Sequence, residues 1–218
     1  LELSLKHLKR LAQGSQTKFL TMQILDSFQV LDFPYEEQKT LISSVCAIDS
    51  KIRLNVRICS ELESMAKTLY DYWFVQLDFP DENGKPYRTS GGEMVWNEQL
   101  KREIPKGWKV KSLGKIIIEN EKSKVQVNNA KNCKGNYPFF TSGDTNLRWN
   151  KAQVTGRNCF LNTGGNADVK YYVGEAAYST DTWCITSQNG FEDYLYLLLL
   201  SYKPIMNRKF FQGTGLKH

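Results

Sequence analysis

Glycines near the end of the sequence come closest to a chemical site. Residues 211–215 read Phe-Gln-Gly-Thr-Gly, which matches the F-x-G-x-G pattern of S-adenosylmethionine sites in methyltransferases. In that setting the glycines lie between a strand and a helix, so that the backbone can approach the cofactor closely. Here the pattern ends a helical stretch, and the sequence has no Asn or Asp followed by Pro-Pro and an aromatic residue. We therefore interpret these glycines as a turn and expect no cofactor.

Few residues could carry metal-dependent or acid–base chemistry. The histidines are His7 and His218, and no two of the five cysteines lie closer than 13 residues apart, which suggests neither a zinc cluster nor a disulfide framework. Residues 164–168 contain two glycines but lack the Lys-Ser/Thr pair of a phosphate-binding loop. The remaining candidate ligands follow no metal-ligand spacing; they are Asp144, Asp168 and Asp181. We predict a non-catalytic protein without a metal site.

Charge is distributed unevenly along the sequence. Residues 106–218 hold sixteen Lys and Arg against eight Asp and Glu, a net charge of +8, while the rest of the sequence sums to −2. Such an excess in one section points to a polyanionic partner, with nucleic acid first. The alternative is that the excess charge serves only solubility.

Reading DNA requires polar side chains on loops that reach base edges, with Lys and Arg around them for the phosphates. Residues 141–148 form such a loop candidate, and residues 179–182 lie between two strand candidates. An Asn-rich stretch with Lys122, Lys124, Lys131 and Lys134 suits phosphate contact; its alternative is a disordered basic loop. The residues predicted to contact DNA are Thr141, Ser142, Asn146, Arg148, Asn166, Lys170, Ser179, Thr180, Gln212, Thr214, Lys217, Lys122 and Lys124.

A long helix must position this basic section. From residue 41 to residue 73 apolar residues recur three and four apart, with Asn55 as the polar exception, which is the pattern of a coiled-coil seam. Pro34 suits a helix start, and no Gly or Pro follows before Pro80. Forty-odd helical residues make a rod of about 60 Å, too long to bury its seam against a small domain. We expect a second helix as partner; the alternative is a core helix of one globular domain. The predicted pairing residues are Leu41, Val45, Ile48, Ile52, Asn55, Cys59, Leu62 and Leu69.

Four sections follow from these patterns. Residues 1–33 form a tail that begins with a short amphipathic helix, residues 34–77 the long helix, residues 78–107 a wrapping linker rich in Pro and Gly, and residues 108–218 a domain. In the linker, Trp96, Leu100 and Ile104 predict a helical turn.

The last section changes to a period of two, which predicts strands. Strand candidates cover residues 116–118, 137–140, 159–162, 169–173 and 184–187. A helix is expected over residues 191–202, ending before Pro204, and a second over residues 205–211. The fold class is α+β, with a long coiled-coil helix joined by a linker to a strand-rich domain. The longest apolar run, residues 195–200, is too short to span a bilayer, so we expect no membrane contact and a cytoplasmic location.

The sequence resembles the specificity subunit of type I restriction-modification enzymes. The residues that carry this are Pro34 with Glu36-Glu37-Gln38, then Leu-Tyr-Asp-Tyr-Trp-Phe-Val at 69–75, Asp-Phe-Pro-Asp-Glu-Asn-Gly-Lys-Pro-Tyr at 78–87 and Ile-Pro-Lys-Gly-Trp at 104–108. After residue 108 only scattered features are similar, as expected where each target-recognition domain reads a different sequence.

This resemblance implies a fold and a set of partners. It implies two target-recognition domains held apart by two antiparallel helices, each domain reading part of a split site in double-stranded DNA. It also implies that methylation and cutting belong to methyltransferase (M) and restriction/translocase (R) subunits. This chain departs from the pattern, because it has one such helix and one recognition domain, and residues 1–33 resemble only the tail of another. We therefore expect one of three states: a fragment, a naturally shortened subunit or half of an antiparallel homodimer.

Two other classes of function fit the residues. The first is a coiled-coil oligomerising scaffold whose β-rich domain binds an anionic glycan or protein. The second is a stand-alone methyltransferase, which would have to bind its cofactor. Selection of DNA duplexes separates the first from a DNA reader, because a scaffold should enrich no motif.

Overall fold

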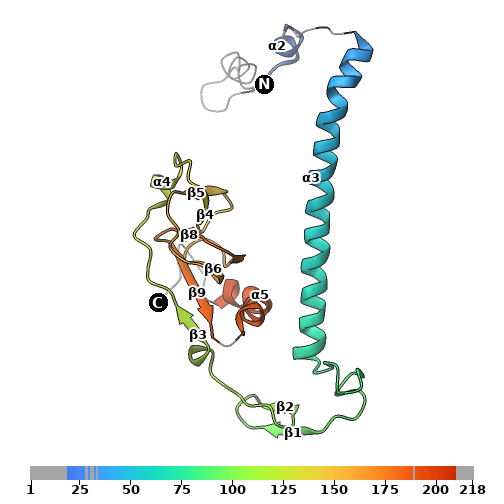
Figure 1. Cartoon of the computed structure of the whole chain (residues 1–218), viewed down its shortest axis with the longest axis vertical. Coiled ribbons are helices and arrows are strands. Elements are labelled where there is room, and N and C mark those ends of the chain that lie inside the picture. The colour runs from blue at the N-terminus through green and yellow to red at the C-terminus, as the bar shows by residue number, and fades with distance from the viewer. Residues whose placement is uncertain (1–18, 28, 30–31, 33, 189, 210–218) are drawn as a thin grey trace. The chain divides into compact units, whose positions relative to one another are not determined.

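The computed structural model describes residues 19–27, 29, 32, 34–188 and 190–209. The helix expected within residues 1–12 and the glycine motif at 211–215 lie outside these residues. The chain divides into two compact units, Leu1–Cys59 and Ser60–His218, and the long helix runs from the first into the second (Figure 1). None of the described helices combines the length and the hydropathy needed to cross a bilayer.

The predicted long helix is confirmed as α3, Tyr35–Tyr70, and is preceded by the short helix α2, Met22–Asp26. At the start of α3 the amide of Gln38 donates to the carbonyl of Pro34 at 3.0 Å, and two glutamates lie in the first turn, where the helix dipole favours negative charge. Its 36 residues span about 54 Å. A π-helical turn, η1 at Asp71–Val75, continues the helix until Leu77 adopts a positive φ of 67° and ends it.

The linker contains a β-hairpin, so the expected helical turn at Trp96, Leu100 and Ile104 is wrong. Strands β1, Met94–Asn97, and β2, Arg102–Pro105, pair antiparallel. The side chain of Asn97 accepts hydrogen bonds from the amides of Gln99 and Leu100 at 3.1 and 3.0 Å. This Asn-centred turn explains the hairpin, because a short side-chain acceptor stabilises a turn more than a helix.

The linker is held together by one carboxylate and a row of aromatic rings. The carboxylate of Asp78 accepts from the amide and hydroxyl of Thr89, at 2.8 and 2.6 Å, and these hydrogen bonds lower its pKa. Phe79 stacks on Tyr87 and on Trp108, with centroids 4.8 and 5.1 Å apart. The linker thus folds on itself as a small body.

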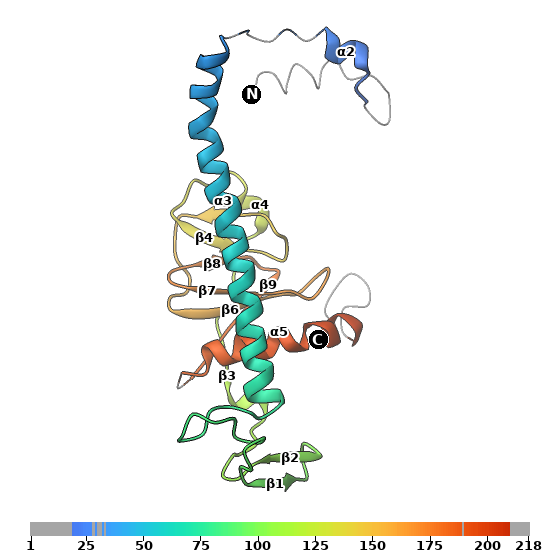
Figure 2. The same ribbon diagram turned by 90° about the vertical axis from the view of Figure 1, so that its right-hand side faces the viewer.

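The last section forms two sheets and a helix (Figures 1 and 2). The four-stranded sheet has the order β3-β9-β6-β7, and the three-stranded sheet the order β5-β4-β8. The strands are β3 Ile117–Glu119, β4 Tyr137–Phe140, β5 Leu147–Trp149, β6 Arg157–Asn162, β7 Val169–Val173, β8 Ala177–Tyr178 and β9 Thr182–Ser187. The helical elements are η2 Leu113–Lys115, α4 Val127–Ala130 and α5 Glu192–Lys209. All five predicted strands are present; β5 and β8 were not predicted.

Strand alternation divides the core of this domain into two layers. Cys159 and Leu161 of β6 pack with Leu195 and Leu199 of α5 on one face of the four-stranded sheet. Phe160, on the other face, packs with residues of the three-stranded sheet and lies 1% exposed. The order of layers is therefore helix, four-stranded sheet, three-stranded sheet.

Helix α5 continues through Pro204, so the predicted break before this proline and the separate second helix are wrong. A proline inside a helix removes a backbone hydrogen bond. Tertiary contacts offset this loss: Asn207 accepts from the amide of Ala167 at 2.6 Å, and Lys203 pairs with Asp168 at 2.5 Å. Both contacts fix the end of α5 to the turn between β6 and β7.

Gly135 allows a close approach of two backbone segments beside β5. A Cβ added at Gly135 would lie 1.9 Å from the carbonyl carbon and oxygen of Trp149. We expect Gly135→Ala to lower the free energy of unfolding by about 2 kcal/mol or more, because a strand must shift to admit the methyl group. Gly114→Ala is the control, because a Cβ added at Gly114 would have no atom within 4 Å. Thermal unfolding of the two variants tests the prediction. Equal melting temperatures for the two variants would contradict the prediction.

Candidate nucleic-acid interface

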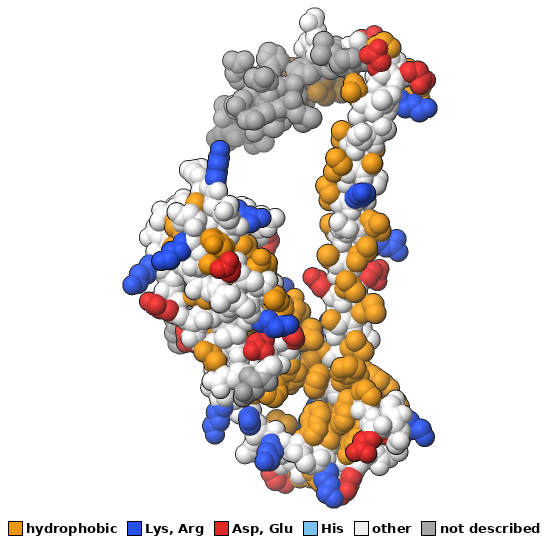
Figure 3. Space-filling view, in the orientation of Figure 1, with side chains coloured by type: hydrophobic (Ala, Val, Ile, Leu, Met, Phe, Trp, Pro, Cys, Tyr) orange, Lys and Arg blue, Asp and Glu red, His pale blue; other side chains and the backbone are white. Residues whose placement is uncertain are grey.

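The positive charge of the strand-rich domain is concentrated on one part of it. Residues 122–153, which include α4, β4 and β5, hold six Lys and Arg and one acidic residue, whereas residues 154–209 hold five of each sign. Figure 3 shows several separate basic side chains on the part of the domain that contains α4, β4 and β5, and a second group toward the linker. We call Lys122, Lys124, Lys131, Lys134, Arg148 and Lys151 the basic surface; all six are exposed.

A buried serine presents two of these lysines. Ser123 is 6% exposed, and its hydroxyl accepts from the amide of Val125 at 3.1 Å and from the side chain of Gln153 at 2.9 Å. Gln153 in turn accepts from the amide of Tyr178 at 2.7 Å. Because Ser123 is fixed inward, its neighbours Lys122 and Lys124 are directed outward, where they could meet phosphates.

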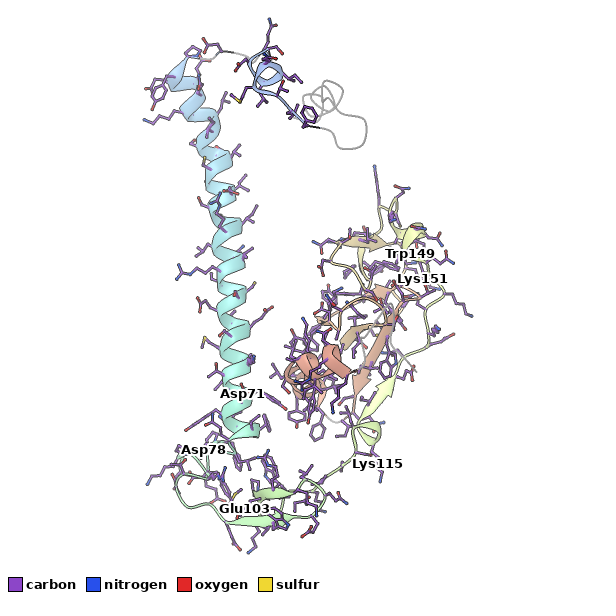
Figure 4. The ribbon with its side chains drawn as sticks, turned by 180° about the vertical axis from the view of Figure 1, so that it is seen from behind. Asp71, Asp78, Glu103, Lys115, Trp149 and Lys151 are labelled. Carbon is purple, nitrogen blue, oxygen red and sulfur yellow. The ribbon has the colours of Figure 1, made fainter. Side chains whose placement is uncertain are left out.

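Arg148 lies on β5, at the edge of the three-stranded sheet. Its guanidinium donates to the carbonyl of Asn136 at 2.7 Å, which holds the exposed side chain in one position. In Figure 4, Trp149 and Lys151 lie together at the end of the domain with the three-stranded sheet, whereas Lys115 lies at the other end. Arg148 belongs to a strand, and not to the loop predicted for residues 141–148.

Several residues predicted to contact DNA are hydrogen-bonded to other loops of the domain. We call the region where residues 141–143, 163–168 and 179–181 meet the loop junction. There Ser142 donates to the carbonyl of Asp181, and Lys170 donates to the carbonyls of Thr141 and Gly143, both at 2.6 Å. Thr141 is 4% exposed and Ser179 is fully buried, with its hydroxyl bonded to Asp181 and Thr182. These side chains support the loops.

The remaining predicted contacts are at the surface or outside the described residues. Asn146 and Asn166 are exposed, and Thr180 is half-buried with its amide bonded to the carbonyl of Val125 at 2.9 Å. Gln212, Thr214 and Lys217 lie outside the described residues. The prediction omitted Lys151, which lies in the stretch of residues 122–153 that holds six Lys and Arg against one acidic residue.

The predicted pairing residues form a second exposed surface on α3. Their apolar side chains range from 46% exposed at Leu69 to 66% at Val45, and Asn55 and Cys59 are also exposed. Exposed apolar side chains in a row along a helix are typical of a surface that another helix covers.

Metal and thiol chemistry find little support among the described residues. They contain no group of His, Cys, Asp and Glu that could hold a metal ion. Burial raises the pKa of the Cys159 and Cys184 thiols to about 12, so both remain protonated at neutral pH and are poor nucleophiles.

Comparison with known families decides where this chain belongs. A family model described as Type I restriction modification DNA specificity domain matches residues 105–218, slightly more than half of the chain. The chain belongs to this family. The resemblance inferred from the sequence is thus confirmed. The family model matches the segment after residue 108, where the sequence shows only scattered features of the family.

Relatives of the specificity family show how much of a subunit this chain represents. The Type I restriction enzyme MjaIX specificity subunit of Methanocaldococcus jannaschii is 30% identical over 115 residues, which cover 51% of this chain and 24% of that protein. The Type-I restriction-modification system S subunit from M. genitalium has a similar fold, with a TM-score of 0.50 and 13% identity over 95% of this chain and 54% of that one. The HsdS subunit from Thermoanaerobacter tengcongensis gives a TM-score of 0.42 and 14% identity over 80% of this chain and 43% of that one.

These comparisons set the scope of the family assignment. The chain spans about half of the M. genitalium S subunit, and its matching segment about a quarter of the MjaIX subunit. At 13% identity the M. genitalium structure supports the fold alone. The specificity-domain match contains the whole basic surface and the whole loop junction.

Proposed function

We propose that residues 108–218 bind double-stranded DNA and read a short sequence, as the non-catalytic specificity component of a type I restriction-modification complex. The observation that carries this is the basic surface, which lies within the segment matched by the specificity-domain family. Lys and Arg that neutralise phosphates supply the sequence-independent part of DNA affinity. A chain that reads DNA in this way acts in the cytoplasm and needs no cofactor.

Selection from random duplexes tests this proposal. The purified chain should enrich one short motif, and its affinity for that motif should fall steeply as salt concentration rises. Enrichment of no motif, or equal affinity for the selected and a scrambled duplex at every salt concentration, would refute sequence reading. The same result would favour an oligomerising scaffold that binds an anionic glycan or protein.

We further propose that α3 pairs with another helix through its exposed seam and docks M subunits, with an R subunit joining the full complex. In the chain by itself, the partner is a second copy in antiparallel orientation. Antiparallel pairing puts one recognition domain at each end of the helix pair, so the dimer would read an inverted repeat. The support is the length of the seam, which runs over several heptads with a single polar position, Asn55.

A further inference from the structure

Lys170 occupies an unusual place for a lysine in a basic domain. It lies on β7, opposite Phe160 of β6, on the face of the four-stranded sheet that packs against the three-stranded sheet. Among the ion pairs of the described residues, none includes Lys170. Two of its three N–H donors are instead directed at the carbonyls of Thr141 and Gly143, each at 2.6 Å. The half-buried ammonium group is therefore committed to the loop between β4 and β5.

Further bonds fix the base of the same loop. Asn162 donates to the carbonyl of Ser142 at 2.9 Å, and the hydroxyl of Ser142 accepts from the amide of Thr163 at 3.3 Å. The hydroxyl of Thr141 accepts a hydrogen bond from the amide of Gly143 at 3.1 Å. With the carbonyl of Asp181, which accepts from the hydroxyl of Ser142, three separate segments of the chain thus hold residues 141–143 in one conformation.

The tip of this loop is free. Asp144, Thr145 and Asn146 are exposed, and among the described residues their side chains have no hydrogen-bond or ion-pair partner. Their chemistry suits base edges: an Asn amide pairs with adenine N6 and N7, an Asp carboxylate accepts from cytosine N4, and a Thr methyl contacts the thymine methyl. Arg148, part of the basic surface, follows on β5.

We infer that Lys170 is a positioning residue, which holds residues 144–146 as a preformed base-reading element and does not itself contact DNA. This inference rests on the proposed function. Rigid presentation of a loop lowers the entropic cost of ordering it on the target, and the lost freedom is greatest for exposed loops. Loss of the Lys170 bonds therefore reduces discrimination between sequences, while contacts with phosphates remain.

Lys170→Met tests the inference, because it keeps the apolar stem and removes the donors. With the full chain and the selected duplex, we expect the preference over scrambled DNA to fall about tenfold or more. Affinity for scrambled DNA and the slope of affinity against salt should stay unchanged. Lys124→Met is the matched control: it should keep the preference and reduce the slope by about 0.9. If Lys170→Met behaves like Lys124→Met, Lys170 contacts a phosphate and the inference is wrong.

A second comparison guards against simple loss of folding. Lys170→Arg can still donate to two carbonyls, so it should retain part of the preference for the selected duplex that Lys170→Met loses. The two variants should have similar melting temperatures. When the selection is repeated, Asn146→Ala should lose base preference at positions of the motif where Lys170→Met also loses it. Loss of preference at different positions would overturn the inference. A wild-type chain that enriches no motif refutes the proposed function and the inference with it, whereas an undiminished preference in Lys170→Met refutes the inference alone.

Discussion

Replacing Lys122, Lys124, Lys131 and Lys134 by glutamine should lower affinity for duplex DNA about a hundredfold or more near 0.1 M salt, whatever the sequence. All four side chains are exposed in a stretch that holds one acidic residue, so each can neutralise a phosphate. Each lost contact removes about 0.9 from the slope of log affinity against log salt, so the slope should fall by about 3 to 4. Titration of a labelled duplex by fluorescence anisotropy at several salt concentrations measures both quantities.

A matched variant separates local contact from overall charge. Replacing Lys39, Lys51, Lys67 and Lys85 by glutamine removes the same number of charges from exposed positions on α3 and the linker. If the basic surface contacts DNA, this variant should keep most of its affinity and its salt slope. Equal losses in the two variants would mean that net charge alone attracts DNA, and the interface proposed for residues 122–153 would be wrong.

The elements that could be predicted from the sequence are those whose pattern is local. The seam of α3 and the alternation in β6, β7 and β9 repeat over several residues. Most ends of these elements lie within two residues of the predicted ends. Strand β8 has two residues and its partner β4 lies far along the chain, so no periodicity marks it. The intrinsic preference of Pro204 predicts a break, but the contacts of Asn207 with Ala167 and of Lys203 with Asp168 stabilise the helix beyond it.

The candidate site was predictable as a region more than as a set of residues. Polar loop residues are enriched both where a protein reads a ligand and where loops support one another, because both roles need hydrogen bonds. Ser142 and Lys170 differ from Asn146 only through carbonyl acceptors 27 to 39 residues away along the chain. Local sequence carries no information on such partners. The count of charges over residues 106–218, together with the lysines at 122, 124, 131 and 134, predicted a basic section that contains the basic surface.

Placing an aspartate in the seam of α3 should abolish helix pairing. Ile52 is 57% exposed on the unpaired helix and occupies the middle of the seam, so pairing would bury it. A carboxylate there must lose its hydration without gaining a partner, which costs several kcal/mol and weakens association more than about a hundredfold. Sedimentation equilibrium of Ile52→Asp at micromolar concentration should show monomer where the wild-type chain shows dimer. Ser50→Asp, on the outer face of the same helix, should leave the dimer intact.

A substitution at Asn55, on the same surface, should change helix association in the opposite direction to Ile52→Asp. A polar residue at one seam position weakens a coiled coil but favours the register in which it finds a polar partner. Asn55→Leu should therefore tighten association while relaxing the orientation of the two helices, which cross-linking between cysteines introduced near either end of α3 would detect as mixed parallel and antiparallel pairs. A wild-type chain that stays monomeric would exclude the homodimer. If Ile52→Asp then also failed to weaken binding of methyltransferase subunits, the seam would have no role in assembly, and the proposal for α3 would fail as a whole.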